Sequence, residues 1–409
     1  MSKKSLFIAS FSTVVEWYDF TLYLFFASVI SKVFFGDNPH SIILTLFGFA
    51  LAYFMRPLGA IFFAHIGDRF GRKITLMTTI SIMFVATLLT ALLPTFSQIG
   101  IYSGILMIIL RMVMAFSVGG EYISIVTYLL ESAPKKRQGL MASLAPGFSE
   151  VGALLAVFTS ALSAHFFNEA DLLSYGWRMP FLIGSALALI IFISRSQMAE
   201  SKEFIKVQKL DRPLIWTLKH FKKQIAKTFS VSALGSISYY VGIGFVPVFL
   251  SMTAGFSQST ALWISTAASF AVIIITPFFG ALGDYFGQKR VLIGLAILNA
   301  ILPIGAFYLM SGSGIFLALL GAITLAIIAA GVSAVAASAT PLQFETKNRL
   351  SGLSLGVTVA TSIFGGLTPL LAQYLTDLSG LSYAPGIMIA IVGLAVIPIF
   401  MTLKQPKLA

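Results

Sequence analysis

A seven-residue stretch, GDRFGRK at 67–73, lies between two long apolar segments of this chain. It recurs as GDYFGQK at 283–289, again between two long apolar segments, and Asp284 follows Asp68 by 216 residues. Self-similarity at one fixed offset is the sequence signature of an internal duplication. The stretch therefore predicts that the chain consists of two similar halves.

A second set of charged positions repeats at nearly the same offset. Glu131 and Arg137 follow one apolar segment, and Glu345 and Arg349 follow another, with 214 residues between the two glutamates. Two repeated patterns at nearly the same sequence offset indicate repeats that run in the same direction through the fold. We therefore expect two halves of parallel topology.

The apolar content indicates where these halves fold. Of the 409 residues, 57% are hydrophobic and only 10% are charged, whereas soluble proteins have about 45–50% apolar and about 25% charged residues. A helix needs about 20 apolar residues to cross roughly 30 Å of hydrocarbon, so the sequence predicts an all-α membrane protein with twelve transmembrane helices. Their expected ranges are 6–34, 41–66, 74–93, 99–131, 138–166, 178–195, 226–252, 258–283, 291–311, 314–341, 350–375 and 383–403.

One long polar interruption divides the twelve predicted spans into six and six. Residues 196–225 are rich in lysine, and parts of this segment have the amphipathic pattern of a helix that lies on a membrane surface. We therefore expect an N-terminal six-helix bundle at 1–195, this cytoplasmic linker, and a C-terminal six-helix bundle at 226–409.

The formal net charge of +12 would suggest a nucleic-acid partner in a soluble chain. In membrane proteins, however, Lys and Arg concentrate in cytoplasmic loops. All but four of the 27 basic residues fall at the termini or in the loops after even-numbered spans. We therefore expect a multi-pass protein of the cytoplasmic (inner) membrane with both termini in the cytoplasm and no nucleic-acid partner. The four exceptions are Lys32, Arg56, Arg111 and Arg178.

The chain has no cysteine and only four scattered histidines. This composition excludes disulfides and thiolate catalysis and argues against a metal site. The sequence also lacks a nucleophile with its base and a soluble catalytic domain. We therefore expect no enzyme activity, no metal and no cofactor.

The repeated loop stretch resembles the signature of the major facilitator superfamily, G-x-x-x-D-R-x-G-R-K, between helices 2 and 3. Ala64 replaces the first glycine of the first copy, and Gln288 replaces the arginine of the second. Within the superfamily, four segments resemble the metabolite:proton symporters that include the proline/glycine-betaine, α-ketoglutarate, citrate and shikimate carriers. These segments are VEWYDF at 15–20, RPLG at 56–59, FSVGGEY at 116–122 and GWRMPF at 176–181.

Six ionisable side chains fall in the mid-membrane interiors of predicted spans, all of them in the first half. A charge in a membrane span costs about 2.5–3.5 kcal/mol on insertion scales, so these residues are candidates for function as well as for structural ion pairs. Glu16, Asp19 and Tyr23 are spaced i, i+3 and i+7, which places them on one stripe of helix 1; we expect this stripe to line the central cavity. The six residues are Glu16, Asp19, Arg56, Arg111, Glu121 and Glu150.

A proton-coupled carrier needs a carboxylate that loads a proton in one environment and releases it in another. Asp19, Glu121 and Glu150 are the candidates for this role. The resemblance to the superfamily also implicates Arg111, in helix 4, in proton transfer, and it implies that the proton gradient supplies the energy.

The same residues limit the chemical class of the substrate. Four carboxylates against two guanidiniums favour a cation, a zwitterion or proton uptake. Tyr239 and Tyr240 lie in helix 7 beside several Gly residues and Pro247, a composition typical of a breakable helix with aromatic faces. Such faces either pack against neighbouring helices or hold an ammonium group by cation–π contact.

The loop motifs predict a gate at the cytoplasmic end. The resemblance implies that Asp68 engages the amino-terminal end of helix 11, where a helix dipole contributes up to about 2 kcal/mol, and that charge pairs including Glu131 close the same end. The expected gate residues are Asp68, Arg69, Arg72, Glu131, Arg137, Asp284, Glu345 and Arg349.

We expect proton-coupled uptake of a small polar metabolite, with proline or betaine as the first choice of substrate. Uptake of a di- or tricarboxylate or related organic acid is the first alternative. An exporting antiporter is the second, although Ala145-Pro146-Gly147 and Gly152 only partly resemble the antiporter element G-P-x-x-G-G. The expected partners are the substrate, protons and the lipid bilayer, and we expect a monomer.

Overall fold

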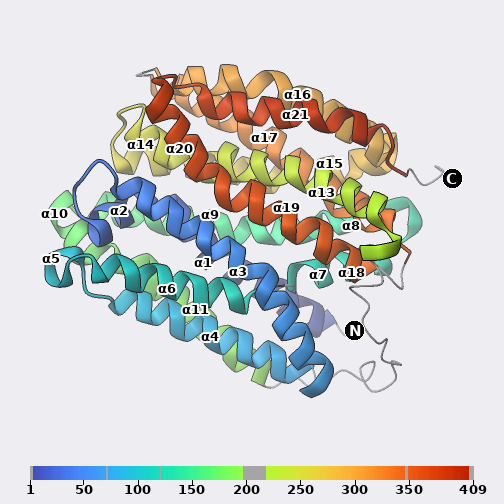
Figure 1. Ribbon diagram of the computed structural model, residues 1–409, viewed down its shortest axis with the longest axis horizontal. Coiled ribbons are helices and arrows are strands. Elements are labelled where there is room, and N and C mark those ends of the chain that lie inside the picture. Colours follow the sequence, from blue (N-terminus) through green and yellow to red (C-terminus); the bar gives the residue numbers. More distant parts are fainter. Residues whose placement is uncertain are drawn as a thin grey trace.

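The computed structural model (Figure 1) describes residues 3–70, 72–119, 121–196, 218–312, 314–345 and 349–404. Side chains are described at all of these positions except 3–12, 64–76, 121, 124, 128, 132, 195 and 350. The predicted surface helix in 196–225 lies mostly outside the described residues.

The first half is a series of helices, because in hydrocarbon each backbone polar group must find its hydrogen bond within the chain. The helices are α1 (Lys3–Phe25), α2 (Ala27–Phe35), α3 (Ser41–Phe70), α4 (Arg72–Leu92), α5 (Phe96–Ile99), α6 (Tyr102–Ser117), α7 (Glu121–Ser132), the 3₁₀ turn η1 (Lys135–Arg137), α8 (Gln138–Ala142), α9 (Leu144–Phe166), α10 (Glu169–Asp171), the π-helical segment η2 (Leu172–Gly176) and α11 (Arg178–Ser196).

The second half is also helical and contains three π-helical segments, which occur in proteins mostly as single-turn bulges near functional sites. Its elements are α13 (Lys222–Tyr239), the π segment η4 (Tyr240–Gly244), α14 (Val246–Met252), α15 (Gln258–Phe286), α16 (Gln288–Met310), α17 (Ile315–Ala339), the 3₁₀ turn η5 (Pro341–Gln343), α18 (Arg349–Leu353), the π segment η7 (Ser354–Thr358), α19 (Val359–Thr361), the π segment η8 (Ser362–Leu367), α20 (Thr368–Ser379) and α21 (Ala384–Phe400).

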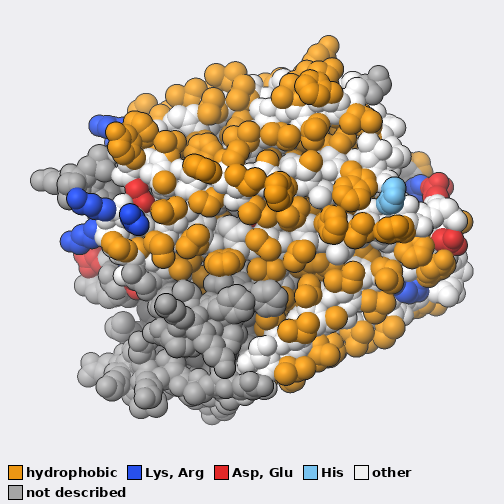
Figure 2. Space-filling model, turned by 180° about the vertical axis from the view of Figure 1, so that it is seen from behind, with side chains coloured by type: hydrophobic (Ala, Val, Ile, Leu, Met, Phe, Trp, Pro, Cys, Tyr) orange, Lys and Arg blue, Asp and Glu red, His pale blue; other side chains and the backbone are white. Residues whose placement is uncertain are grey.

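Helix length and composition support a membrane-spanning fold. Among the described residues, seven helices are long and apolar enough to cross a membrane, and two bent pairs raise this number to nine. Three shorter apolar helices, at Met77–Leu92, Tyr102–Ser117 and Ala384–Phe400, accompany them. Figure 2 shows hydrophobic side chains over the middle of one face, with charged side chains near its two ends. This is the surface expected of a chain with a lipid-facing belt.

Three predicted spans are broken rather than continuous. Helix 1 bends by 67° between α1 and α2, and helix 7 bends by 41° between η4 and α14. The predicted span 99–131 is interrupted between Ser117 and Glu121. A Cβ at Gly119 would lie 2.3 Å from the carbonyl oxygen of Arg56, so this break lies where the α6–α7 junction closely approaches α3.

The helices of the two halves lie in two layers in Figure 1, with the blue and green helices of residues 3–196 below the yellow and red helices of residues 222–404. The layers meet where α9 packs on α15 and α3 packs on η8. The first and last described segments lie at the same end of the molecule. Helix α1 packs mainly on α9 and α11 of its own layer, which places its polar side chains at the centre of the fold.

Candidate functional site

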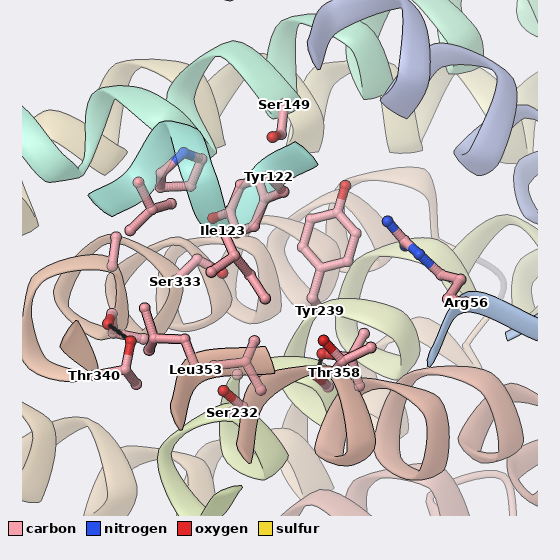
Figure 3. Close-up of a pocket in the computed structure, with 18 of the residues that line it drawn as sticks. Arg56, Tyr122, Ile123, Ser149, Ser232, Tyr239, Ser333, Thr340, Leu353 and Thr358 are labelled. Atoms are coloured by element: carbon pink, nitrogen blue, oxygen red, sulfur yellow. Dashed lines mark hydrogen bonds between the residues drawn. The ribbon is translucent and has the colours of Figure 1, made fainter. Parts of the chain in front are cut away.

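A cavity of about 150 Å³ lies where the two layers meet (Figure 3). The first half contributes the charged side chains of the described wall together with two aromatic ones, and the second half contributes hydroxyl groups and two tyrosines. The main polar and aromatic residues of the wall are Trp17, Arg56, Tyr122, Ser149, Glu150, Ser232, Ser236, Tyr239, Tyr240, Ser333, Thr340, Thr358, Thr361 and Ser362. The cavity therefore combines charge from one half with uncharged polarity from the other.

Arg56 reaches the cavity from α3 and is paired with Glu16 of α1. Its Nη2 atom donates a hydrogen bond to Oε1 of Glu16 at 2.9 Å. The guanidinium also lies over the rings of Phe20 and Tyr53, at 4.6 and 5.6 Å from their centroids. These contacts hold a buried cation in place and neutralise it with one carboxylate.

Arg111 of α6 forms a second buried ion pair, with Asp19 of α1. Its Nη1 atom lies 2.8 Å from Oδ2 of Asp19, and its Nη2 atom donates to Oγ1 of Thr90 at 3.1 Å. Thr87 donates to the other carboxylate oxygen of Asp19 at 2.6 Å. This pair is not part of the cavity wall; it lies between α1, α4 and α6 within the first half.

Glu150 of α9 differs from the other buried carboxylates. It is 3% exposed and lines the cavity, but it makes no ion pair with any residue in the described part of the chain. Its one hydrogen-bond partner there is the hydroxyl of Tyr239, at 3.5 Å from Oε2. A carboxylate without an ion-pair partner in such a setting is costly when charged, so a cation bound beside it would stabilise it.

Aromatic rings form the wall around Glu150. The ring of Trp17 meets the rings of Tyr122 and Tyr239 edge to face, with centroids 6.0 and 5.7 Å apart. Tyr239 in turn meets Tyr240, with centroids 5.1 Å apart. Residues of α1, α7, α13 and η4 thus build one continuous aromatic surface.

The stripe on helix 1 faces a different direction from the one expected. Glu16, Asp19 and Tyr23 point toward other helices of the first half, and the hydroxyl of Tyr23 donates to the carbonyl of Thr45 in α3 at 2.9 Å. Trp17, one residue after Glu16, lines the cavity instead. Consecutive helical residues lie about 100° apart, so helix 1 presents its charges to its own bundle and its indole to the cavity.

At the end of the molecule that holds the GDYFGQK stretch, Asp284 joins the two halves. Its two carboxylate oxygens accept hydrogen bonds from the backbone N–H groups of Gly139 and Leu140, at 2.6 and 2.9 Å. These groups lie in the first turn of α8, where the helix dipole favours a negative charge. A Cβ at Gly280 would lie 2.4 Å from Oγ of Ser143, so this motif glycine permits the close approach of α15 to α8.

A second contact joins the halves at the same end. Glu131 of α7 forms an ion pair with Arg349 at the start of α18. Arg137 lies in η1 and Glu345 follows η5, and both are exposed. The charge pair therefore crosses between the halves instead of linking Glu131 with Arg137.

The structure does not describe the side chains of four expected residues, namely Asp68, Arg69, Arg72 and Glu121. The backbones of Asp68 and Arg69 belong to α3, that of Arg72 to α4 and that of Glu121 to α7.

At the opposite end of the molecule, Ser28 of α2 donates to Oε1 of Gln258 in the other half at 2.7 Å. Two more contacts between the halves lie beside the cavity, whose wall includes Tyr240 and Ser362. The hydroxyl of Tyr53 bonds to that of Tyr240, and Ser362 donates to the carbonyl of Tyr53 at 3.0 Å. The halves are thus joined at both ends of the molecule and beside the cavity.

The sequence pattern did not predict three of these residues as parts of the site. Trp17, Tyr53 and Tyr122 are aromatic residues in apolar spans, where packing is the default interpretation. Only the position of Trp17 and Tyr122 inside the segments VEWYDF and FSVGGEY marked them out. In the described part of the chain, no group of three His, Cys, Asp or Glu side chains is placed to hold a metal ion.

Comparison with known proteins agrees with this geometry. The family model described as "Sugar (and other) transporter" matches residues 5–213, and the model described as "Major Facilitator Superfamily" matches residues 228–409. The fold is similar to that of the xylose transporter XylE from Escherichia coli in a partially occluded inward-open conformation, with a TM-score of 0.74, 18% identity, and coverage of 99% of this chain and 98% of that one.

Curated relatives are similar over nearly the whole chain. The ectoine/proline transporter ProP of Corynebacterium glutamicum is 31% identical, over 96% of this chain and 82% of its own length. The proline/betaine transporter of Escherichia coli K12 is 32% identical, with the same coverage. These relatives and the apolar helices indicate a transporter, not an enzyme, that crosses the inner membrane several times. The chain therefore belongs to the major facilitator superfamily and, within it, to the metabolite:proton symporters.

Proposed function

We propose that this protein takes up a small zwitterionic osmolyte or amino acid, such as proline or betaine, by proton symport and alternating access. Relatives about 30% identical over nearly the full chain are named for proline, betaine or ectoine. The observation that carries the proposal is the cavity itself, in which a guanidinium and an aromatic surface face one space between the two halves.

The two ends of a zwitterion match these two features. Its carboxylate suits the guanidinium of Arg56, which has donors beyond the one that bonds to Glu16. Its ammonium group suits the rings of Tyr239 and Tyr240, because a cation over an aromatic face is attracted by the ring quadrupole. A bare dicarboxylate would fill the second position with a negative charge against these rings, which is unfavourable.

For the proton we propose Asp19. When it is ionised, Arg111 and Thr87 hold it as observed; when it is protonated, the ion pair loses its attraction and Arg111 is released. Asp19 and Trp17 are on the same helix, two residues apart, so a rearrangement of this pair is transmitted to the cavity wall. The pair is buried, so its electrostatic interaction is not weakened by water as a surface pair would be.

The proposed topology has twelve spans with both termini in the cytoplasm. The nine spans and the three shorter apolar helices together supply the twelve. The end that holds Asp284 also holds the basic residues of η1, Lys135 to Arg137, and basic loops are retained in the cytoplasm. The contacts of Asp284 and of Glu131 with Arg349 then form the cytoplasmic gate.

We further propose that residues 1–195 and 226–409 form two six-helix bundles that move relative to each other, with 196–225 as the linker. The protein acts as a monomer, needs no cofactor and uses the proton gradient as its energy source. Its partners are the substrate, protons and lipid.

Uptake into proteoliposomes tests the proposal. With an imposed gradient, acid outside, the purified protein should accumulate radiolabelled proline or betaine, and a protonophore should abolish the accumulation. A thermal-shift screen against amino acids, betaines, and di- and tricarboxylates should show stabilisation by the zwitterions, because a ligand that binds the folded state stabilises it. Stabilisation by organic acids alone, or accumulation that is indifferent to the pH gradient, would refute the proposal.

A further inference from the structure

We infer that Glu150 and the aromatic rings around it form an ammonium subsite that binds quaternary ammonium cations even when they carry no carboxylate. This inference rests on the proposed function for the identity of the natural substrate, and it adds a ligand class and a specificity-determining residue. It also separates Glu150 from proton transport, which belongs to Asp19 in the proposal above.

The charge balance of the cavity leads to this inference. Arg56 and Glu150 are the charged side chains among the described residues that line the cavity. Arg56 is already neutralised by Glu16 at 2.9 Å, whereas Glu150 has only the hydroxyl of Tyr239 at 3.5 Å. The described cavity wall therefore has one carboxylate with no cation beside it, and a bound cation would offset the cost of burying that carboxylate in its ionised form.

The rings around Glu150 suit a methylated ammonium group better than a metal ion or a lysine. A quaternary ammonium has no N–H to donate, so it gains little from hydroxyl acceptors and much from aromatic faces. The hydroxyl of Tyr239 lies 3.5 Å from Oε2 of Glu150, Tyr122 and Tyr240 line the same cavity, and Trp17 touches both Tyr122 and Tyr239. Aromatic groups and the carboxylate thus converge on one part of the cavity.

Arg56 lies at a separate part of the wall. Its guanidinium contacts Glu16 and lies over the rings of Phe20 and Tyr53, and it has no described contact with Glu150. In the view of Figure 3, the ring of Tyr239 lies between Tyr122 and Arg56. A zwitterion can use both parts at once, with its ammonium at Glu150 and its carboxylate at Arg56. A cation without a carboxylate needs only the part at Glu150.

Binding measurements on the purified full-length protein test the subsite. The probes are tetramethylammonium, choline, betaine and proline, measured by isothermal titration calorimetry. We expect the wild type to bind tetramethylammonium and choline, and Glu150→Gln to weaken tetramethylammonium binding at least tenfold, which corresponds to about 1.4 kcal/mol. Glu150→Asp, which keeps the charge, should weaken it less. The matched control is Glu169→Gln, the same change at an exposed residue that pairs with Lys32, and it should leave binding unchanged.

Transport by Glu150→Gln distinguishes a carboxylate that binds the ammonium group from one that carries the proton. In proteoliposomes, Glu150→Gln should still accumulate betaine or proline in response to a pH gradient when the substrate concentration is raised to offset its weaker binding. Loss of gradient-driven accumulation with intact exchange would identify Glu150 as the proton carrier and overturn the inference. Tetramethylammonium binding that is absent in the wild type, or equal in Glu150→Gln and the wild type, would also overturn it.

These results distinguish the inference from the proposed function. A wild-type protein that binds tetramethylammonium through Glu150 but neither binds nor transports proline or betaine would support the subsite and refute the proposed substrate. A wild-type protein that transports betaine but binds no cation lacking a carboxylate would support the proposed function and refute the subsite.

Discussion

Replacing Asp284 by Asn should weaken the contact that joins the two halves at the proposed cytoplasmic end. The carboxylate of Asp284 accepts two backbone N–H groups, from Gly139 at 2.6 Å and from Leu140 at 2.9 Å. Asn keeps one acceptor oxygen but presents an NH₂ group to the second N–H, so one hydrogen bond is lost. The variant also removes the negative charge from the amino-terminal end of α8.

The size of the effect follows from these two losses. A carboxylate at a helix amino terminus contributes about 0.3–1 kcal/mol, and up to about 2 kcal/mol in a partly buried site. Hydrogen bonds with an ionised partner are roughly twice as strong as neutral ones. We therefore expect Asp284→Asn to lose about 1–2 kcal/mol of the closed state's stability, which changes the closed-to-open ratio by about 5- to 30-fold.

Distance measurements between spin labels report this ratio directly. The chain has no native cysteine, so Lys136→Cys and Arg290→Cys, two exposed positions on opposite halves at this end, accept labels without a background. In lipid nanodiscs, double electron–electron resonance should show a shift from the short-distance to the long-distance population in Asp284→Asn. The unlabelled variants should elute from gel filtration as the wild type does.

Asp377→Asn is the matched control, because Asp377 is exposed at the other end and bonds to Gln373 of its own helix, 2.8 Å away. It should leave the ratio at the Asp284 end unchanged. If both populations are seen in the wild type and Asp284→Asn alters their ratio less than twofold, the contact does not stabilise the closed state and the reasoning is refuted.

Four further substitutions test other parts of the mechanism. Asp19→Asn should abolish gradient-driven accumulation while substrate exchange persists, measured as uptake and counterflow in the same proteoliposomes; wild-type accumulation would return Asp19 to a structural role. Glu121→Gln should likewise reduce accumulation, and unchanged uptake would remove it from the candidates for proton transfer. Asp68→Asn should slow turnover while calorimetry shows unchanged substrate binding; loss of binding with normal cycling would contradict its gate role. Gly366→Val should destabilise the protein by about 1–3 kcal/mol through overpacking, because a Cβ there would lie 2.5 Å from Cβ of Tyr53; an unchanged midpoint of thermal unfolding would show that the helices separate at little cost.

Periodicity and repetition predicted the helical architecture well, because a membrane span has a length that hydrocarbon thickness imposes. The bend in helix 7 was also predicted, from the glycines and Pro247, and it occurs as the 41° angle after η4. The breaks in helix 4 and the π segments of helix 11 were not predicted. They depend on close contacts with another helix, such as Gly119 against α3, and hydropathy along one chain segment carries no information about its neighbours.

The site shows the same division between what one helix specifies and what packing specifies. The i, i+3, i+7 spacing correctly groups Glu16, Asp19 and Tyr23 on one stripe, but it does not say which neighbours the stripe meets. Packing pairs Glu16 with Arg56 and Asp19 with Arg111. Of the three buried carboxylates Glu16, Asp19 and Glu150, only Glu150 then has no described ion-pair partner. Assigning these two ion pairs needs distances between residues that are 40 and 92 positions apart in the sequence, which no local pattern contains.

The uneven distribution of charge between the halves has a mechanical consequence. The described buried ion pairs, Glu16 with Arg56 and Asp19 with Arg111, both lie within the first half, so protonation changes interactions inside that half first. The second half faces the cavity with hydroxyls and Tyr239 and Tyr240, whose hydrogen bonds can be exchanged at small net cost. In the proposed mechanism a proton therefore alters the shape of one half, and the substrate, held between Arg56 and the rings of the other half, is the link that makes the second half respond.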